Sequence, residues 1–188
     1  MPDRVLVAAD GWEDLADAEQ FYPDDLPEEW RLSYFANANS AVYLPRARWG
    51  GVADDRLAAW GEGVHPRFRF YLGDARRAGD QVRNPAISRA VDLLGDALGA
   101  FVTTAATRGD RGARLLAPVA AAGAAQGAST GTALFCPEHM NTDLRAARSW
   151  LQSPTVAEAP GPCLIILRHP SSMQLAAWHS LLDLLGLS

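Results

Sequence analysis

The run Cys163-Leu164-Ile165-Ile166-Leu167 is continuously apolar, and the polar pair Arg168-His169 follows it directly. A strand that is apolar on both faces needs cover on both faces, which is typical of parallel sheets enclosed by helices. Further runs of this kind occur at Val5 to Ala9, Ser40 to Leu44, Phe68 to Leu72 and Thr132 to Cys136. The sequence therefore predicts an α/β fold with about five mostly parallel strands and flanking helices.

Helix signals fill the segments between these runs. The clearest begins at Asn84-Pro85, after which apolar residues recur at a period of 3.6 positions as far as Ala105. This stripe predicts one amphipathic helix of about 20 residues. Three weaker signals also predict helix starts. One is a first-turn proline, Pro27, and the others are hydroxyl residues that can cap a helix N-terminus: Thr142, and Ser171 or Ser172.

The predicted order is βα repeated five times within a single domain of residues 1–188, interrupted by an Ala- and Gly-rich stretch at about 107–131. That stretch has few large side chains to anchor in a core, so we expect a flexible insertion there. Five strands are too few to close a small barrel, so we expect both sheet edges to be covered. A homo-oligomer or a protein partner is the predicted cover.

The charge balance limits the functions open to the chain. Its 22 acidic and 17 basic residues give a net charge of −5, which disfavours nucleic-acid binding. All the basic residues are arginine, so lysine-dependent P-loop, pyridoxal and protein-kinase chemistry is excluded.

Compartment and redox state follow from what the chain lacks. No apolar run approaches the length of a membrane span, and the amino end does not resemble a signal peptide. We therefore expect a cytoplasmic protein without membrane contact. Cys136 and Cys163 both lie in apolar runs, which favours buried, reduced thiols.

Four groups of residues occur in an order that resembles a known family. They are Gly11-Trp12 with Phe21-Tyr22-Pro23 and Glu29-Trp30, then Trp60 with His65-Pro66 and Phe68-Arg69-Phe70, then Leu134-Phe135-Cys136-Pro137, and finally Arg168-His169-Pro170-Ser171. Together they resemble the YecE-like family (domain of unknown function 72) over nearly the whole chain. The resemblance implies a fold similar to a TIM barrel, with polar groups at the carboxyl ends of the strands.

The departures from the family pattern are as informative as the matches. Where the family has charged or amide groups, this chain has Val42, Leu44, Gly73, Ile166 and either Phe135 or Cys136. The residues that remain are Gly11, Trp12, Tyr22, Pro23, Arg168 and His169. The loss of two carboxylates and a lysine removes acid/base and charge-clamping groups. The resemblance therefore implies a truncated, degenerate barrel.

The pair Arg168-His169 is the strongest candidate for a site. An arginine directly after a buried strand needs a carboxylate or another anion nearby. Two readings stay open: an internal salt bridge to Asp10 or Asp74, which end other strands, or a ligand-binding site that holds an anion. Trp12, which the resemblance retains, is a further ligand-binding candidate.

A second group, Cys136-Pro137-Glu138-His139, follows the predicted strand Thr132 to Cys136. A thiol and an imidazole can bind a metal or form a reactive thiolate, but no paired zinc-ligand spacing is present. We expect no metal and no cofactor. If the chain were an enzyme, a rebuilt catalytic site would draw on the candidates at the strand ends: Asp10, Asp74, Glu138, His139, Arg168 and His169.

Arg46, Arg48 and Trp49 form an arginine-aromatic loop. Trp and Arg are enriched among the residues that dominate protein interfaces, so this loop is the predicted partner-binding site. Taken together, the sequence favours a non-catalytic binding or scaffold protein. The alternative is a hydrolase or phosphate-handling enzyme with a site rebuilt at the carboxyl ends of the strands.

Overall fold

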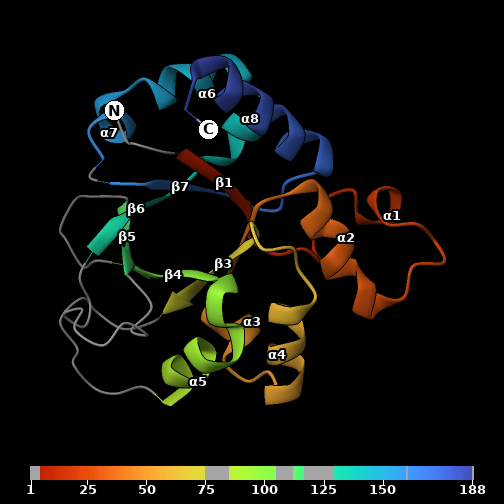
Figure 1. The fold of residues 1–188 in the computed structure, drawn as a ribbon. Helices are drawn as coiled ribbons and strands as arrows, with labels where there is room; N and C mark the ends of the chain where they lie inside the picture. Colours follow the sequence, from red (N-terminus) through yellow and green to blue (C-terminus); the bar gives the residue numbers. More distant parts are fainter. Residues whose placement is uncertain (1–4, 75–84, 105–111, 117–128, 160, 188) are drawn as a thin grey trace.

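The computed structural model describes residues 5–74, 85–104, 112–116, 129–159 and 161–187. Its strands form one barrel in chain order, with β7 returning to pair with β1 (Figure 1). The strands are β1 (Val5–Ala9), β2 (Ala41–Leu44), β3 (Arg69–Asp74), β4 (Leu98–Thr104), β5 (Gly112–Leu116), β6 (Ser129–Phe135) and β7 (Cys163–Leu167).

Six strands form an all-parallel sheet that curves into a nearly closed barrel, in the order β4, β3, β2, β1, β7, β6. The remaining strand, β5, is antiparallel to both β4 and β6 and completes the ladder between them. The predicted α/β class, the mostly parallel strands and the flanking helices are confirmed.

The helical segments lie around the outside of the barrel (Figure 1). They are α1 (Ala18–Phe21), η1 (Glu28–Trp30), α2 (Arg31–Ala38), α3 (Arg46–Trp49), α4 (Asp54–Glu62), α5 (Pro85–Leu94), η2 (Gly95–Ala97), η3 (Glu138–Asn141), α6 (Leu144–Leu151), α7 (Pro154–Ala157) and α8 (Ser172–Leu185).

The predicted 20-residue helix is wrong in its second half. Helix α5 ends at Leu94, Gly95 adopts a left-handed φ of 50°, and the chain then enters strand β4. A register shift places Gly99 outside the β3–β4 pairing, since Phe70 faces Leu98 and Tyr71 faces Ala100. Such a bulge keeps Leu98 and Phe101 on one side of the strand although they are three positions apart. The spacing therefore imitates a helix.

Two further predictions need correction. Part of the expected flexible insertion at about 107–131 is strand, namely β5 and the beginning of β6, while 107–111 and 117–128 lie outside the described residues. The sheet edges predicted to need cover are paired instead, because β5 bonds to both of its neighbours. Strand pairing thus gives no reason for self-association.

The barrel wall separates two apolar cores. The interior is filled by side chains on alternate strand positions, four of which are alanine: Ala8, Ala41, Tyr71, Ala100, Val102, Ala133, Leu164 and Ile166. The larger core lies between the wall and the helices and contains the opposite strand faces, including Val42, Phe70, Leu72 and Ile165. This alternation is the reason the wall strands read as continuously apolar.

Helix α8 closes the described part of the chain against β1. Of the two predicted caps, Ser171 and Ser172, it is Ser171 that caps the helix, in a capping box with Gln174, and Gly186 ends it with a φ of 66°. Helix α6, by contrast, is capped by the side chain of Asp143 rather than by Thr142. Within the described ranges, none of the helices has the length and apolar character needed to cross a bilayer.

Candidate functional site

Four side chains meet at the carboxyl end of the barrel, and we call them the mouth cluster: Asp10, Tyr43, Phe135 and Arg168. Tyr43 and Phe135 are the last inward-facing residues of β2 and β6 and pack against the interior core. Asp10 and Arg168 follow Ala8 and Ile166 by two positions, so they continue the inward register just past β1 and β7. Four different strands therefore position this site.

The aromatic members form its floor. The rings of Tyr43 and Phe135 meet edge to face, with their centroids 5.5 Å apart. The Arg168 guanidinium lies over the Phe135 ring, 5.1 Å from its centroid. Both aromatic side chains keep partly exposed surface, so an entering group can contact them.

The two charged members, Arg168 and Asp10, influence the pKa of Tyr43. Burial raises the pKa of the Tyr43 phenol, the nearby Arg168 opposes that rise, and Asp10 adds to it. The hydroxyl is therefore protonated near neutral pH and can donate a hydrogen bond. It lies against Gly73: a Cβ at that position would be 2.6 Å from the hydroxyl oxygen.

Arg168 is exposed and forms no ion pair with a described carboxylate. Asp10, one of the two partners considered for it, instead accepts a hydrogen bond of 2.8 Å from the backbone N–H of His169. His169 has a left-handed φ of 44°, which turns the chain away from β7. The guanidinium therefore has its face on Phe135 and its donors open to an incoming group.

Three backbone N–H groups at the start of α8, those of Ser171, Ser172 and Gln174, already donate to the protein's own oxygens. Asp17 accepts from the backbone N–H of Ser172 at 2.8 Å and from its hydroxyl at 2.6 Å. The Ser171 hydroxyl accepts from the Gln174 N–H, and the Gln174 side chain accepts from the Ser171 N–H. A helix N-terminus often binds phosphate, but these N–H groups are not free to do so.

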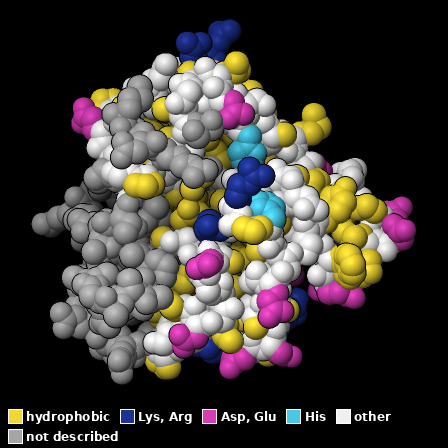
Figure 2. All heavy atoms as spheres, in the orientation of Figure 1, with side chains coloured by type: hydrophobic (Ala, Val, Ile, Leu, Met, Phe, Trp, Pro, Cys, Tyr) yellow, Lys and Arg dark blue, Asp and Glu magenta, His cyan; other side chains and the backbone are white. Residues whose placement is uncertain are grey.

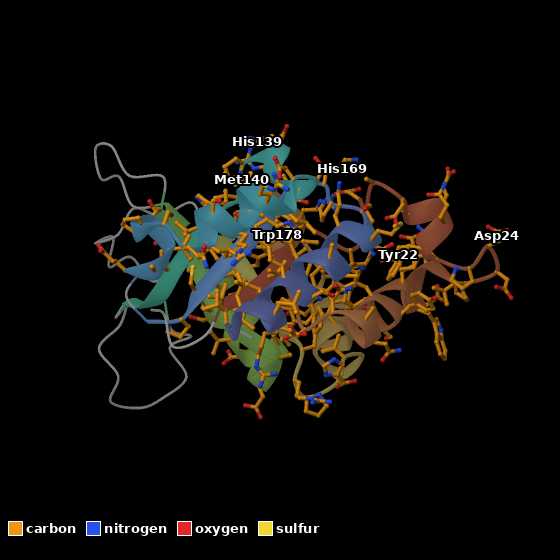
Figure 3. The ribbon with its side chains drawn as sticks, turned by 90° about the horizontal axis from the view of Figure 1, so that it is seen from above. Tyr22, Asp24, His139, Met140, His169 and Trp178 are labelled. Carbon is orange, nitrogen blue, oxygen red and sulfur yellow. The ribbon has the colours of Figure 1, made fainter. Side chains whose placement is uncertain are left out.

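The other catalytic candidates do not join the mouth cluster. Asp74 is buried on the outer register, two positions after Leu72, and takes part in an interaction of its own. Glu138 and His139 lie on η3 with exposed side chains. Asn141 of η3 donates to the Arg168 carbonyl at 3.1 Å, so that segment borders the site. His139 and His169 lie on the same side of the barrel (Figure 3).

Trp12 does not reach the mouth either. Its ring packs in the outer core, edge to face with Trp60 at 5.0 Å and with Phe70 at 6.4 Å. The Trp12 carbonyl accepts a hydrogen bond from the Tyr22 hydroxyl. These two residues thus hold the β1–α1 connection against the barrel.

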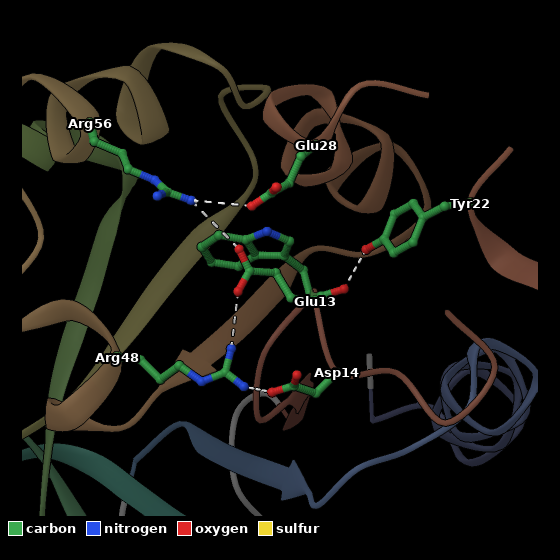
Figure 4. A network of polar contacts seen from close by, with 7 residues as sticks. Glu13, Asp14, Tyr22, Glu28, Arg48 and Arg56 are labelled. Atoms are coloured by element: carbon green, nitrogen blue, oxygen red, sulfur yellow. Dashed lines mark hydrogen bonds and ion pairs between the residues drawn. The ribbon is translucent and has the colours of Figure 1, made fainter. Parts of the chain in front are cut away.

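The predicted arginine-aromatic loop is the short helix α3, and its side chains make contacts within the molecule. Trp49 is fully buried and donates from its indole nitrogen to the Gly73 carbonyl at 2.9 Å, while Arg46 stacks on its ring at 4.4 Å. Arg48 pairs with both Glu13 and Asp14 (Figure 4). A partner at this loop would therefore meet Arg46 and Arg48 but not the Trp49 ring.

The two cysteines are not part of the mouth cluster. Cys136 and Cys163 are free, buried thiols, and burial raises the pKa of each to about 12. Such thiols are poor nucleophiles and poor metal ligands near neutral pH. In the described part of the chain, no three His, Cys, Asp or Glu side chains group closely enough to hold a metal ion.

Sequence reasoning missed Tyr43 and Phe135 as site residues. Both lie in runs read as continuous apolar strands, and such runs do not reveal which face lines the barrel. The available signal was alternation: Tyr43 follows Ala41, and Phe135 follows Ala133, each by two positions.

The search of family models, of curated proteins and of solved structures found no match to this chain. The functional argument therefore depends on the geometry of the mouth cluster.

Proposed function

We propose that this protein binds a small carboxylate ligand at the mouth cluster and does not catalyse a reaction. The observation that carries the proposal is Arg168, an exposed guanidinium stacked on Phe135 without a described carboxylate partner. A stacked guanidinium presents its N–H groups edgewise in the fork that fits a carboxylate. The Tyr43 hydroxyl supplies a further donor beside it.

The backbone N–H groups that already have acceptors near the site favour a carboxylate over a phosphate. A phosphate group has a larger charge and more acceptor oxygens, and proteins usually meet it with several backbone N–H groups. Here Asp10 accepts from the His169 N–H and Asp17 from the Ser172 N–H. Both carboxylates would also repel a dianion.

The aromatic floor favours a ligand with an apolar body. Tyr43 and Phe135 expose part of their rings next to the guanidinium. An aromatic or branched aliphatic group can pack there while its carboxylate faces Arg168.

The dispersal of the candidate acids and bases supports binding without turnover. Asp74 belongs to the outer core, and Glu138 and His139 are exposed on η3. Two positions where the resemblance implies lost charges, Gly73 and Ile166, belong to the inward register, and they carry no ionisable group. Descent from a YecE-like barrel is our proposal for this pattern.

Phenylacetate is a suitable probe, because it combines a carboxylate with an aromatic body. We expect phenylacetate to bind more tightly than acetate, and inorganic phosphate and neutral benzyl alcohol to bind more weakly still, in a heteronuclear NMR titration. Substituting Arg168→Gln removes charge-assisted hydrogen bonds, which contribute roughly 1.5–3 kcal/mol, so the affinity should fall about 10- to 100-fold.

Arg148→Gln is the matched control, because Arg148 is an exposed arginine of α6 outside the mouth. Its affinity for phenylacetate should equal that of the unchanged protein. Equal losses in both variants, or phosphate binding more tightly than phenylacetate, would reject the proposed site.

A further inference from the structure

A second surface lies on the α1–α2 part of the molecule, apart from the mouth cluster. It consists of Trp30 and Tyr34, with Asp24, Asp25 and Glu29 beside them, and we call it the acidic aromatic surface. Trp30 is 61% exposed and Tyr34 is 38% exposed. Figure 2 shows apolar side chains gathered over the α1–α2 part of the molecule, with acidic side chains at the border of that patch.

The two exposed rings lie on one helical face. Trp30 is the residue before α2 and has helical dihedral angles, so Trp30 and Tyr34 are neighbours at a spacing of four. Tyr34 packs edge to face on Phe21 at 5.3 Å and on Tyr22 at 5.8 Å. The surface is thus held by an aromatic stack underneath, and little ordering is needed when a partner binds.

The charge around these rings is one-sided. Residues 13–30 contain eight carboxylates and no arginine, whereas the rest of the chain has 17 arginines and 14 carboxylates. The segment therefore has a charge of −8 in a protein whose net charge is −5. No other part of the sequence concentrates charge of one sign to this degree.

The carboxylates nearest the barrel are neutralised within the molecule. Glu13 and Asp14 pair with Arg48, and Glu28 lies 3.9 Å from Arg56 (Figure 4). Asp17 holds the first turn of α8.

The outer carboxylates have no such partner. Glu19, Asp24, Asp25 and Glu29 are exposed and form no ion pair with any described residue. Asp24 lies at the outer end of this segment, and Tyr22 lies further in (Figure 3). The nearest arginine in sequence, Arg31, stacks over the inner ring of Tyr22 at 5.3 Å.

We infer that the acidic aromatic surface binds a basic, arginine- or lysine-bearing segment of another protein. A cation can rest on the exposed Trp30 ring while neighbouring basic groups pair with Asp24, Asp25 and Glu29. Charge complementarity selects this occupant. Nucleic acid and anionic membranes would be repelled, and two copies of this chain each have a net charge of −5.

A fluorescent ten-residue peptide of alternating arginine and alanine is the probe, and its anisotropy is measured with the full chain. Trp30→Ala should weaken binding about fivefold through loss of the cation–π contact. The double substitution Asp24→Asn and Asp25→Asn should weaken it two- to fivefold at low salt, with a smaller effect at about 0.3 M salt. Tyr34→Ala is the second aromatic variant should Trp30→Ala fail to fold.

Two controls match these variants. Asp92→Asn with Asp96→Asn removes the same charge from exposed positions on α5 and η2, and Leu184→Ala removes an 85% exposed apolar side chain from α8. Both should bind the peptide within twofold of the unchanged protein. The inference is overturned if the charge control loses as much affinity as the Asp24 and Asp25 variant, or if both aromatic variants bind normally. It is equally overturned if light scattering shows a dimer that Trp30→Ala dissociates.

Discussion

Arg168 and Asp10 follow two neighbouring strands, but each side chain interacts with a different partner rather than with the other. The sequence offered them as a salt bridge, yet the Asp10 carboxylate accepts from the His169 backbone and the Arg168 guanidinium stacks on Phe135. The chain turns away from β7 at His169, whose φ is positive, directly after the peptide N–H from which Asp10 accepts. Backbone geometry of this kind is not visible in a residue pattern, so the sequence could identify the two residues but not their arrangement.

Gly73 is the residue on which the position of Tyr43 depends. A Cβ there would lie 2.6 Å from the Tyr43 hydroxyl oxygen and 3.1 Å from the Pro45 Cα. Gly73→Ala should therefore displace the Tyr43 ring, cost about 1–3 kcal/mol in the free energy of unfolding and weaken phenylacetate binding. Urea unfolding and the NMR titration measure the two effects.

Gly51→Ala is the control for this substitution, because no heavy atom lies within 4 Å of its added Cβ. Its stability should remain within about 0.5 kcal/mol of the unchanged protein. Equal free energies of unfolding for the two variants would contradict the claim that the position of Tyr43 depends on the absence of a side chain at Gly73.

The two buried thiols predict an alkaline limit to stability. Burial raises the pKa of Cys136 and Cys163 from 9.0 to about 12, so each thiol ionises more readily in the unfolded chain. The contribution of the two buried thiols to the free energy of unfolding is complete below pH 9 and is lost as the pH rises toward 12. At about pH 10 the loss is on the order of 1 kcal/mol per thiol.

Urea unfolding at about pH 8 and about pH 10 measures this loss. The double variant Cys136→Ala and Cys163→Ala should lose less stability between the two pH values than the unchanged protein. It should retain a smaller dependence from Tyr22 and Tyr43, whose pKa values burial also raises. An identical fall in both proteins would contradict the assignment to the thiols.

At the scale of elements, the helix caps were partly predictable. Either Ser171 or Ser172 was expected to cap the final helix, and Ser171 does so, because its hydroxyl accepts from the Gln174 N–H. The cap of α6 is Asp143, one residue after the predicted Thr142, since the Asp143 carboxylate reaches the N–H groups of Arg145 and Ala146. Asp ranks above Thr as an N-cap residue, so the capping preference already favoured Asp143.

Removal of the Ser171 cap gives a direct test of that element. Ser171→Ala should lower the free energy of unfolding by about 0.5–2 kcal/mol, because a backbone donor at the start of α8 loses its acceptor. Ser180→Ala is the control within the same helix, since its hydroxyl only bonds back to the Ala176 carbonyl on the exposed face. Urea denaturation that finds equal losses for the two serines would contradict a capping role.

Strand β4 shows where element prediction fails. The bulge at Gly99 separates Leu98 from Phe101 by three positions on one strand face, and α5 directly before it has a true helical stripe. The two patterns join into one apparent helix. Gly95 with its left-handed φ marks the boundary, but an isolated glycine within a periodic pattern does not by itself end a helix.

At the scale of the whole molecule, the two strands that the sequence did not predict, β4 and β5, change the architecture of the sheet. With five strands the sheet would be open and would need another chain to cover its edges, whereas β4 and β5 complete a barrel ladder. The class, the parallel strands and the helices outside them could be predicted from apolar runs. Closure could not, because β5 lies in a stretch without an apolar pattern of its own.

The site lies at the ends of four neighbouring strands of this curved sheet, in the order β2, β1, β7 and β6. The central claim is that Arg168 at this site binds a carboxylate. The most direct measurement is a crystal structure of the protein with phenylacetate. The claim predicts the carboxylate within about 3 Å of the Arg168 guanidinium, with the phenyl ring against Phe135 and Tyr43. Phenylacetate bound elsewhere, with Arg168 paired to a carboxylate of its own chain, would contradict it.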